Sequence, residues 1–312
     1  MTALRILHLS DTHLMAGDAR HEGSVDTVAA YQFTLEAFAN AGPLDLVVLS
    51  GDVSDDGSPA SYRTLQTLTE DYAKNHGAVA VYAMGNHDQR SGFRAVLGTG
   101  HPAGEHSGSV ESPIIGVSYV TGYRIITLDS SVPGRTHGYL DAVQLRWLRS
   151  LLSTPSGHGS VVVIHHPPVE PVSALHQGIE LINAGEFAQA LAGSDTLAVL
   201  SGHYHHHLND SLHTDSGPIP VIVTSGIVNS NDVLASSGHE RALAGSGGAL
   251  ITISATSSTG AGTHGTVARV RTLPFRFQLP ATVSPEVVFD LAPATVAAIS
   301  QKIFATEAER TL

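Results

Sequence analysis

Acidic, amide and imidazole side chains recur in this sequence directly after short apolar runs. Asp11 and His13 follow the run at residues 4–9, and Asp52 follows the run at 44–49. Three later runs end in the segments Asn86-His87-Asp88, His165-His166 and His203-Tyr204-His205. Carboxylate, amide and imidazole donors of this kind hold pairs of transition-metal cations, and a carboxylate with two oxygens can bridge them. The set therefore predicts a two-metal hydrolytic site, with Asp52 as the bridge.

The elements that must position these residues are strands and helices in alternation. The near-continuous Val, Ile and Leu runs indicate strands buried on both faces, at residues 4–9, 44–49, 79–84, 161–164 and 197–200. Helices are expected at 25–41, 59–75, 141–152 and 184–192. Alternating strands and helices predict a parallel sheet, whose binding sites lie just outside the carboxyl ends of the strands. The polar residues should therefore meet at one edge.

Local spacing supports this interpretation. Asp11 and His13, like His203 and His205, are two residues apart, so an extended segment would point both side chains to one side. Glycines precede Asp52, Asn86 and His203 and would allow tight turns. Each motif alone is common, because most Asp and His residues on loops are simply solvated. Five motifs in this order, each after an apolar run, favour the metal site.

The rest of the chain is expected to add antiparallel strands and loops. A hairpin is expected at 118–120 and 124–128, and late strands are expected at 219–224, 249–254 and 266–273. The Gly/Ser/Thr-rich stretches 236–248 and 255–265 are expected to be loops. We expect one catalytic domain over residues 1–275. Residues 276–312 are expected to form an extension, helical from about 294 to 309, packed on this domain or on a second subunit.

Composition excludes several classes of site and partner. The chain has 312 residues and no cysteine, which rules out disulfides, thiolate metal sites and a Cys nucleophile. Its net charge of -12 disfavours binding to nucleic-acid polymers, whereas two bound cations would reverse the field locally for a small anionic substrate. No apolar run reaches the roughly 20 residues that span a bilayer, and no leader is evident. We therefore expect a cytoplasmic protein without integral membrane association.

The motif series resembles that of the calcineurin-like metallophosphoesterases, and it is most similar to the class III cyclic nucleotide phosphodiesterases. The order Asp-x-His, Gly-Asp, Gly-Asn-His-Asp, His and Gly-His-x-His is matched as a whole. The segments 10–14, 84–88, 128–134 and 165–168 also resemble that branch. The resemblance covers residues 4–275, weakens around 235–265 and fades at the C-terminus.

The resemblance implies an α/β protein with a metallo-dependent phosphatase-like αββα four-layer sandwich, in which two mixed sheets lie face to face between helices. One metal ion would be held by Asp11, His13, Asp52 and His205. The other would be held by Asp52, Asn86, His165 and His203. His87 would act as the catalytic residue near the phosphate, which it would contact together with Asn86, and a hydroxide between the metals would attack phosphorus. The same resemblance implies a homodimer.

Some assignments stay open. His165 and His166 are adjacent, so only one can point into the site, and the family spacing favours His165. His206 and His207 depart from the usual motif and are expected to lie outside the metal shell. His137 either approaches the substrate pocket or is an ordinary loop histidine. No aromatic cluster indicates a platform on which a base could stack, since the single Trp147 sits among leucines.

The function implied is hydrolysis of small phosphodiesters. The resemblance indicates 3′,5′-cyclic nucleotides, chiefly cAMP, with 2′,3′-cyclic nucleotides as further substrates. Alternatives are a glycerophosphodiesterase, another small-molecule phosphodiesterase or phosphatase of this superfamily, and a non-catalytic scaffold. The nitrogen-rich ligand set suits Fe, Mn, Zn or Co better than Ca or Mg, and the family favours Fe and Mn.

Overall fold

The structure is a computed structural model, and it describes residues 3–102, 109, 111–260 and 263–308. The strands up to the middle of the chain are β1 Leu4–Leu9, β2 Leu46–Leu49, β3 Val79–Tyr82, β4 Gly116–Val120, β5 Tyr123–Thr127, β6 Ser160–Val163 and β7 Thr196–Ser201. The later strands are β8 Leu208–Thr214, β9 Gly217–Val223, β10 Ser230–Asn231, β11 Glu240–Leu243, β12 Ser246–Gly260, β13 Thr263–Phe277 and β14 Val287–Leu291. The helices are α1 Thr27–Ala37, α2 Pro59–His76, α3 Arg90–Leu97, α4 Ala142–Leu152, α5 Ala184–Leu191 and α6 Pro293–Ala308.

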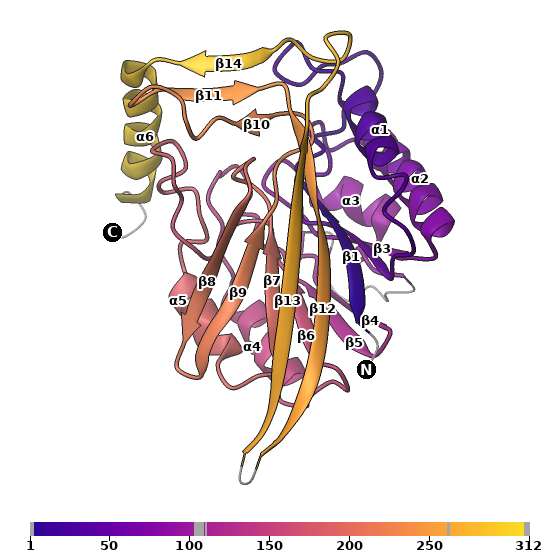
Figure 1. Ribbon diagram of the computed structural model, residues 1–312. Helices are drawn as coiled ribbons and strands as arrows, with labels where there is room; N and C mark the ends of the chain where they lie inside the picture. Colours follow the sequence, from indigo (N-terminus) through magenta and orange to yellow (C-terminus); the bar gives the residue numbers. More distant parts are fainter. Residues whose placement is uncertain (1–2, 103–108, 110, 261–262, 309–312) are drawn as a thin grey trace.

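Two large mixed sheets form the centre of the molecule. The first has the order β13-β12-β1-β2-β3, in which β1, β2 and β3 are parallel, β12 is antiparallel to β1, and β13 is antiparallel to β12. The second has the order β4-β5-β6-β7-β9-β8, with a parallel centre and an antiparallel strand at each edge. Figure 1 shows the long β12–β13 hairpin crossing in front of the second sheet.

The buried side chains define four layers. Between the sheets, residues such as Ile6 and Val48 from the first pack with Ile125 and Val163 from the second. On the outer face of the first sheet, a separate core joins it to helices α1, α2 and α3. On the outer face of the second sheet, another core joins it to α4 and α5. These layers confirm the predicted αββα sandwich. It forms because each central strand is apolar on both faces and needs a covering layer on each.

Local signals set the limits of the helices on which the sheets pack. The side chains of Asp26, Ser58 and Asp141 accept hydrogen bonds from the first turns of α1, α2 and α4. Helix α2 ends at Gly77, whose left-handed conformation suits glycine. All four expected helices are confirmed: α1, α4 and α5 lie inside their predicted ranges, and α2 extends one residue beyond its range.

A third, smaller sheet was not predicted. It has the order β10-β11-β14 and lies beside α6 at one end of the molecule (Figure 1). The prediction that 236–248 is a loop is wrong, because this stretch contains β11 and the start of β12. The prediction that 255–265 is a loop is also wrong for its described part, where β12 and β13 pair residue by residue; residues 261–262 lie outside the described residues.

The segment after residue 275 is strand as well as helix. Strand β14 pairs with β11, and α6 begins at Pro293, close to the helix start predicted at 294. The helix expected at about 294–309 is therefore confirmed for its described part, and the strand that precedes it was not predicted. Among the described helices, none combines the length and apolar character that crossing a membrane requires.

Candidate metal centre

The polar residues that follow five parallel strands come together where the two sheets meet. Within the first sheet, the amide of Asp11 donates to the carbonyl of Gly51 at 3.0 Å, and the amide of His13 donates to the carbonyl of Asp52 at 2.9 Å. The amide of His203, from the second sheet, donates to Oδ2 of Asp11 at 3.0 Å. These bonds join the loop after β7 directly to the loop after β1, which is bonded in turn to the loop after β2.

Side-chain donor atoms converge at this junction. Nε2 of His205 lies 3.3 Å from Oδ1 of Asp11 and 3.4 Å from Nε2 of His13. Oδ2 of Asp52 lies 3.2 Å from Nε2 of His165 and 3.7 Å from Nε2 of His13. Two ligand atoms that are each about 2.1 Å from one cation are roughly 3.0–3.5 Å apart in octahedral or tetrahedral coordination. Asp52 thus lies between two groups of donors, as a bridging carboxylate must.

The outward-facing nitrogen of each of the four predicted histidine ligands is held by an acceptor. Nδ1 of His13 pairs with Oδ1 of Asp55 at 2.9 Å, and Nδ1 of His205 pairs with Oδ1 of Asn229 at 2.7 Å. Nδ1 of His165 pairs with the carbonyl of Ser50 at 2.9 Å, and Nε2 of His203 pairs with the carbonyl of Ile179 at 3.0 Å. Each acceptor requires the N–H on its side of the ring. The lone pair of the other nitrogen is therefore left for a metal ion, the usual arrangement around histidine ligands.

Two buried atoms of the cluster lack a hydrogen-bond partner within the described part of the chain. They are Nε2 of His165 and Oδ1 of Asn86. An unpaired buried polar group is costly, and Nε2 of His165 lies 3.2 Å from the carboxylate of Asp52 without forming a hydrogen bond to it. A cation between these atoms removes the conflict, so the donor set fits a pair of metal ions.

The electrostatics of the metal-free protein favour cations. Burial acts to raise the pKa of Asp11, but His205 and His165 hold it at about 2. Burial likewise opposes the ionisation of Asp52, but His165 and His87 keep its pKa well below the usual range. Burial lowers the pKa of His13 to about 4, which leaves that ring neutral. Burial also acts to lower the pKa of His165, yet Asp52 raises it to about 9, and a bound metal ion would replace the proton that this ring holds.

The backbone at the cluster is strained. Asp11, His13, Asp52, His203 and His205 all have left-handed conformations, with φ between 42° and 69°. Only Glu22 and Thr121 share this feature among the other non-glycine residues that the structure describes. The prediction that the Asp11/His13 and His203/His205 segments are extended is therefore wrong. Strain of this kind persists where the surrounding structure enforces it.

Two of the glycines serve close approach more than turn conformation. A Cβ atom at Gly85 would lie 2.2 Å from Oδ1 of Asp52, and one at Gly202 would lie 2.6 Å from Oδ2 of Asp11. Neither distance is compatible with a side chain. These glycines let the loops after β3 and β7 press against the two carboxylates.

His87 lies at the edge of the cluster. Its amide donates to Oδ1 of Asp52 at 2.9 Å, and its Nδ1 lies 2.8 Å from Oδ1 of Asp55. The side chain is 43% exposed, whereas the four predicted histidine ligands are buried or half-buried. Burial acts to lower its pKa, but Asp52 and Asp55 raise it to about 9. The ring can therefore carry a proton toward the cavity while Asp55 fixes its orientation.

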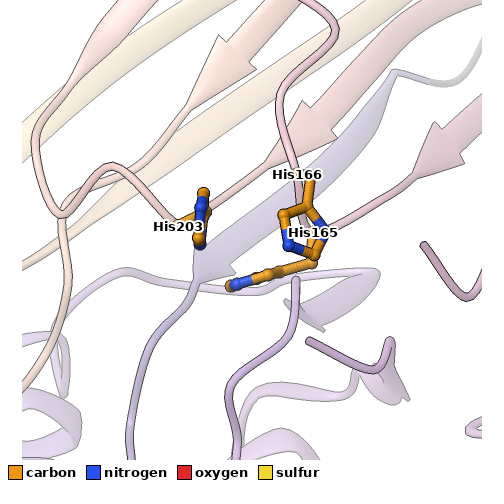
Figure 2. A group of neighbouring side chains, drawn as sticks. All are labelled: His165, His166 and His203. Carbon is orange, nitrogen blue, oxygen red and sulfur yellow. The ribbon is translucent and has the colours of Figure 1, made fainter. Parts of the chain in front are cut away.

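The structure separates the two adjacent histidines after β6. Nδ1 of His166 pairs with Oγ of Ser130 at 2.7 Å, and its Nε2 pairs with the carbonyl of Thr136 at 3.2 Å. Figure 2 shows the rings of His165, His166 and His203 grouped together. The ring centroids of His165 and His203 are 5.0 Å apart. Because both nitrogens of His166 are paired and Nε2 of His165 is not, the geometry favours His165 as the ligand.

The remaining predicted histidines lie around the cluster. His206 is buried and its Nδ1 pairs with the carbonyl of Tyr204, while Nε2 of His207 pairs with the carbonyl of Phe275. His137 is also buried, and its neighbour Thr136 lines the cavity over the cluster. The role of His137 in substrate binding stays a prediction.

Two supporting residues escaped the sequence analysis. Asp55 contacts His13 and His87 through the same oxygen, and its other oxygen lies 3.7 Å from Nδ1 of His21. Its position three residues after Asp52 was a signal that could have been used. Asn229, which holds His205, lies in the loop after β9 and shares no motif with the ligands.

A cavity of about 200 Å³ lies over the cluster. Predicted ligands and His87 form much of its polar lining, namely His13, Asp52, Asn86, His87, His203 and His205, and the other polar residues that line it are His21, Glu22, Thr136, His176, Asn229 and Asn231. Its apolar part consists of Leu175, Ile179, Ala242 and Phe289. Phe289 belongs to β14, so the last part of the chain lines the same cavity as the predicted metal ligands, which are called the metal cluster below.

Comparison with known proteins agrees with this geometry. Residues 4–207 match the family model of the calcineurin-like phosphoesterases. The chain is 37% identical over 244 residues to a cAMP/cGMP dual specificity phosphodiesterase of Mycobacterium tuberculosis, covering 78% of this chain and 73% of that protein. It is 36% identical over 211 residues to the 3′,5′-cyclic adenosine monophosphate phosphodiesterase CpdA of Escherichia coli K12, covering 66% and 71%.

A solved structure shares the fold at much lower sequence similarity. The purple acid phosphatase PPD1 of yellow lupin superposes with a TM-score of 0.54 at 10% identity, covering 88% of this chain and 53% of that one. This likeness supports the architecture alone.

Proposed function

We infer that this chain is a metal-dependent phosphodiesterase, because it belongs to the calcineurin-like phosphoesterase family. We propose that its substrates are 3′,5′-cyclic nucleotides, foremost cAMP. The substrate class rests on the relatives that share more than a third of their aligned residues with this chain and act on cyclic nucleotides. The main support for a metal centre is that four imidazoles each pair one ring nitrogen with an acceptor, which leaves the other nitrogen for a metal ion.

We assign the donors to two cations that share Asp52. Asp11, His13, Asp52 and His205 would hold one, and Asp52, Asn86, His165 and His203 would hold the other; the short distances between these side chains support this assignment. The mixture of imidazole nitrogen and oxygen suits Fe and Mn, with Zn or Co as possible replacements. When bound, such a pair supplies Lewis-acid stabilisation of the charge that develops on the phosphoryl oxygens.

The residues of the chain then account for orientation and proton transfer. Hydrolysis of a 3′,5′-cyclic nucleotide adds water across one P–O bond, and the leaving sugar oxygen must take up a proton. We assign that proton to Nε2 of His87, whose Nδ1 is held by Asp55. The same oxygen of Asp55 holds the ligand His13, so one carboxylate fixes the spacing between the proton donor and the metal shell.

A substrate panel tests the proposal. Protein reconstituted with manganese would be assayed on cAMP, cGMP, 2′,3′-cyclic AMP, a glycerophosphodiester and p-nitrophenyl phosphate. We expect the highest kcat/KM on a 3′,5′-cyclic nucleotide. Faster hydrolysis of the glycerophosphodiester, or of the monoester, would contradict the assignment while leaving the metal centre in place.

A cytoplasmic location and a homodimer remain proposals from the sequence and its resemblance. Light scattering coupled to size-exclusion chromatography measures the mass of the particle in solution and therefore tests the homodimer directly. A mass of one chain, 32.5 kDa, would exclude the dimer under the conditions used.

A further inference from the structure

The cavity over the metal cluster has two chemically different parts. Its polar lining consists of predicted metal ligands, His87 and further polar side chains such as His21 and His176, and its apolar lining consists of Leu175, Ile179, Ala242 and Phe289. Leu175 and Ile179 come from the loop between β6 and α5, whereas Ala242 and Phe289 come from the small sheet. The metal chemistry needs no apolar wall, so this wall requires a separate explanation.

One row of paired residues forms the part of the wall that the small sheet provides. Asn231 of β10 is paired with Ala242 of β11, and Ala242 is paired with Phe289 of β14. Residues directly opposite each other on neighbouring strands project from the same face of a sheet. All three line the cavity, so the small sheet presents this row to the metal cluster.

The row is anchored, and its outermost member is open. Ala242 is 1% exposed, and Nδ2 of Asn231 donates to the carboxylate of the buried Glu240. Phe289 is only half-buried, so part of its ring surface is free to meet a ligand. Within the described residues, it is the only Phe, Tyr or Trp side chain that lines this cavity.

We propose that the row Asn231–Ala242–Phe289 forms a subsite for the nucleobase of a nucleotide whose phosphate lies at the metal cluster, with Phe289 as the residue on which the base packs. The proposal rests on the proposed function and deepens it. A cyclic nucleotide is anionic at one end and carries a neutral aromatic base at the other, which matches the polar and apolar parts of the cavity. Any base has a face that can pack on an aromatic ring, so Phe289 favours nucleotides over phosphates that lack a base.

Binding of products, measured without turnover, tests this subsite. Isothermal titration of the manganese-loaded protein would compare AMP with ribose 5-phosphate, which lacks the base. Base–aromatic packing corresponds to roughly 5- to 150-fold in affinity, so the wild type should bind AMP more tightly by a factor in that range. Phe289→Leu, which keeps apolar bulk without the ring, should lose most of that factor, and Phe289→Tyr should retain it.

The controls are metal content and thermal unfolding, both of which should match the wild type in the Leu variant. Equal affinity of the wild type for AMP and ribose 5-phosphate would overturn the proposal. Full retention of the difference in Phe289→Leu would overturn it as well.

Turnover separates this proposal from the proposed function. If the wild type discriminates AMP through Phe289 but hydrolyses no cyclic nucleotide, the base subsite stands and the cyclic nucleotide activity falls. If the wild type hydrolyses cAMP and Phe289→Leu leaves its KM for cAMP unchanged, the activity stands and the subsite falls. With both correct, Phe289→Leu should raise KM for cAMP much more than it lowers kcat.

Discussion

The metal cluster and the small β10–β11–β14 sheet face the same cavity but are built in different ways. In the cluster, four imidazoles are each held by a hydrogen bond to an acceptor, and five of the predicted ligands have strained backbone conformations. The small sheet presents Ala242 and the half-open Phe289, which offer surface without directed donors. The difference indicates that the two regions have separate functions. Changes in the cluster should abolish chemistry, and changes in the small sheet should alter which ligand is bound.

The largest effect is expected at the shared carboxylate. Asp52→Asn removes the charge that lies between His13 and His165, so neither cation should be retained. We expect metal content to fall together with activity, with a loss of at least about 10³-fold, which exceeds that of a single stabilising donor. Metal analysis by mass spectrometry and the rate of cAMP hydrolysis measure both. Asp210→Asn, at an exposed position on β8, is the matched control.

His87 should affect the rate without affecting the metals. His87→Ala removes the proposed proton donor, whereas the predicted metal ligands remain, so kcat should fall by roughly 10²–10⁴ with full metal occupancy. His213→Ala, an exposed histidine on β8, serves as the control. Undiminished turnover in His87→Ala would remove this residue from the mechanism.

The acceptors behind the ligands should have a smaller effect, and on metal affinity. Asn229→Ala leaves Nδ1 of His205 without its acceptor and should weaken metal binding by roughly 10–100-fold. Asn229→Asp keeps an oxygen at that position and should restore most of the affinity. Titration against a chelator of known affinity gives the comparison. Identical metal affinity in the wild type and the Ala variant would show that the acceptor is not needed.

The smallest effect is expected outside both regions. His207 belongs to the unusual His-rich stretch, but its Nε2 pairs with the carbonyl of Phe275, and it does not line the cavity. His207→Ala should therefore change kcat/KM by no more than about threefold, the scale of an ordinary surface substitution. A loss comparable to that of His87→Ala would extend the functional site beyond the cavity and break the comparison drawn above.

The cluster could be predicted because its residues directly follow strands that can be recognised from the local sequence. The apolar runs before Asp11, Asp52 and His165 are long enough to indicate buried strands, and parallel strands bring their carboxyl ends to one edge. The conformation of those loops could not be read in the same way. Positive φ at Asp11 and His203 is enforced by contacts between the two sheets, such as the bond from the amide of His203 to Asp11.

The small sheet could not be predicted because long-range pairing creates it. Residues 236–248 are rich in Gly and Ser and suggest a loop, yet β11 becomes a strand by pairing with β14 more than forty residues later. Phe289 carries no local signal of a binding role, since it reaches the cavity only through that pairing with Ala242. Asn229 is likewise brought to His205 by the fold alone.

Anomalous X-ray diffraction from crystals of the manganese-loaded protein tests the central claim most directly. The account predicts two anomalous peaks about 3.5–4 Å apart, with Asp52 between them and with His165, not His166, in contact with one of them. A single peak, or peaks at which Asp52 is not a shared ligand, would contradict it.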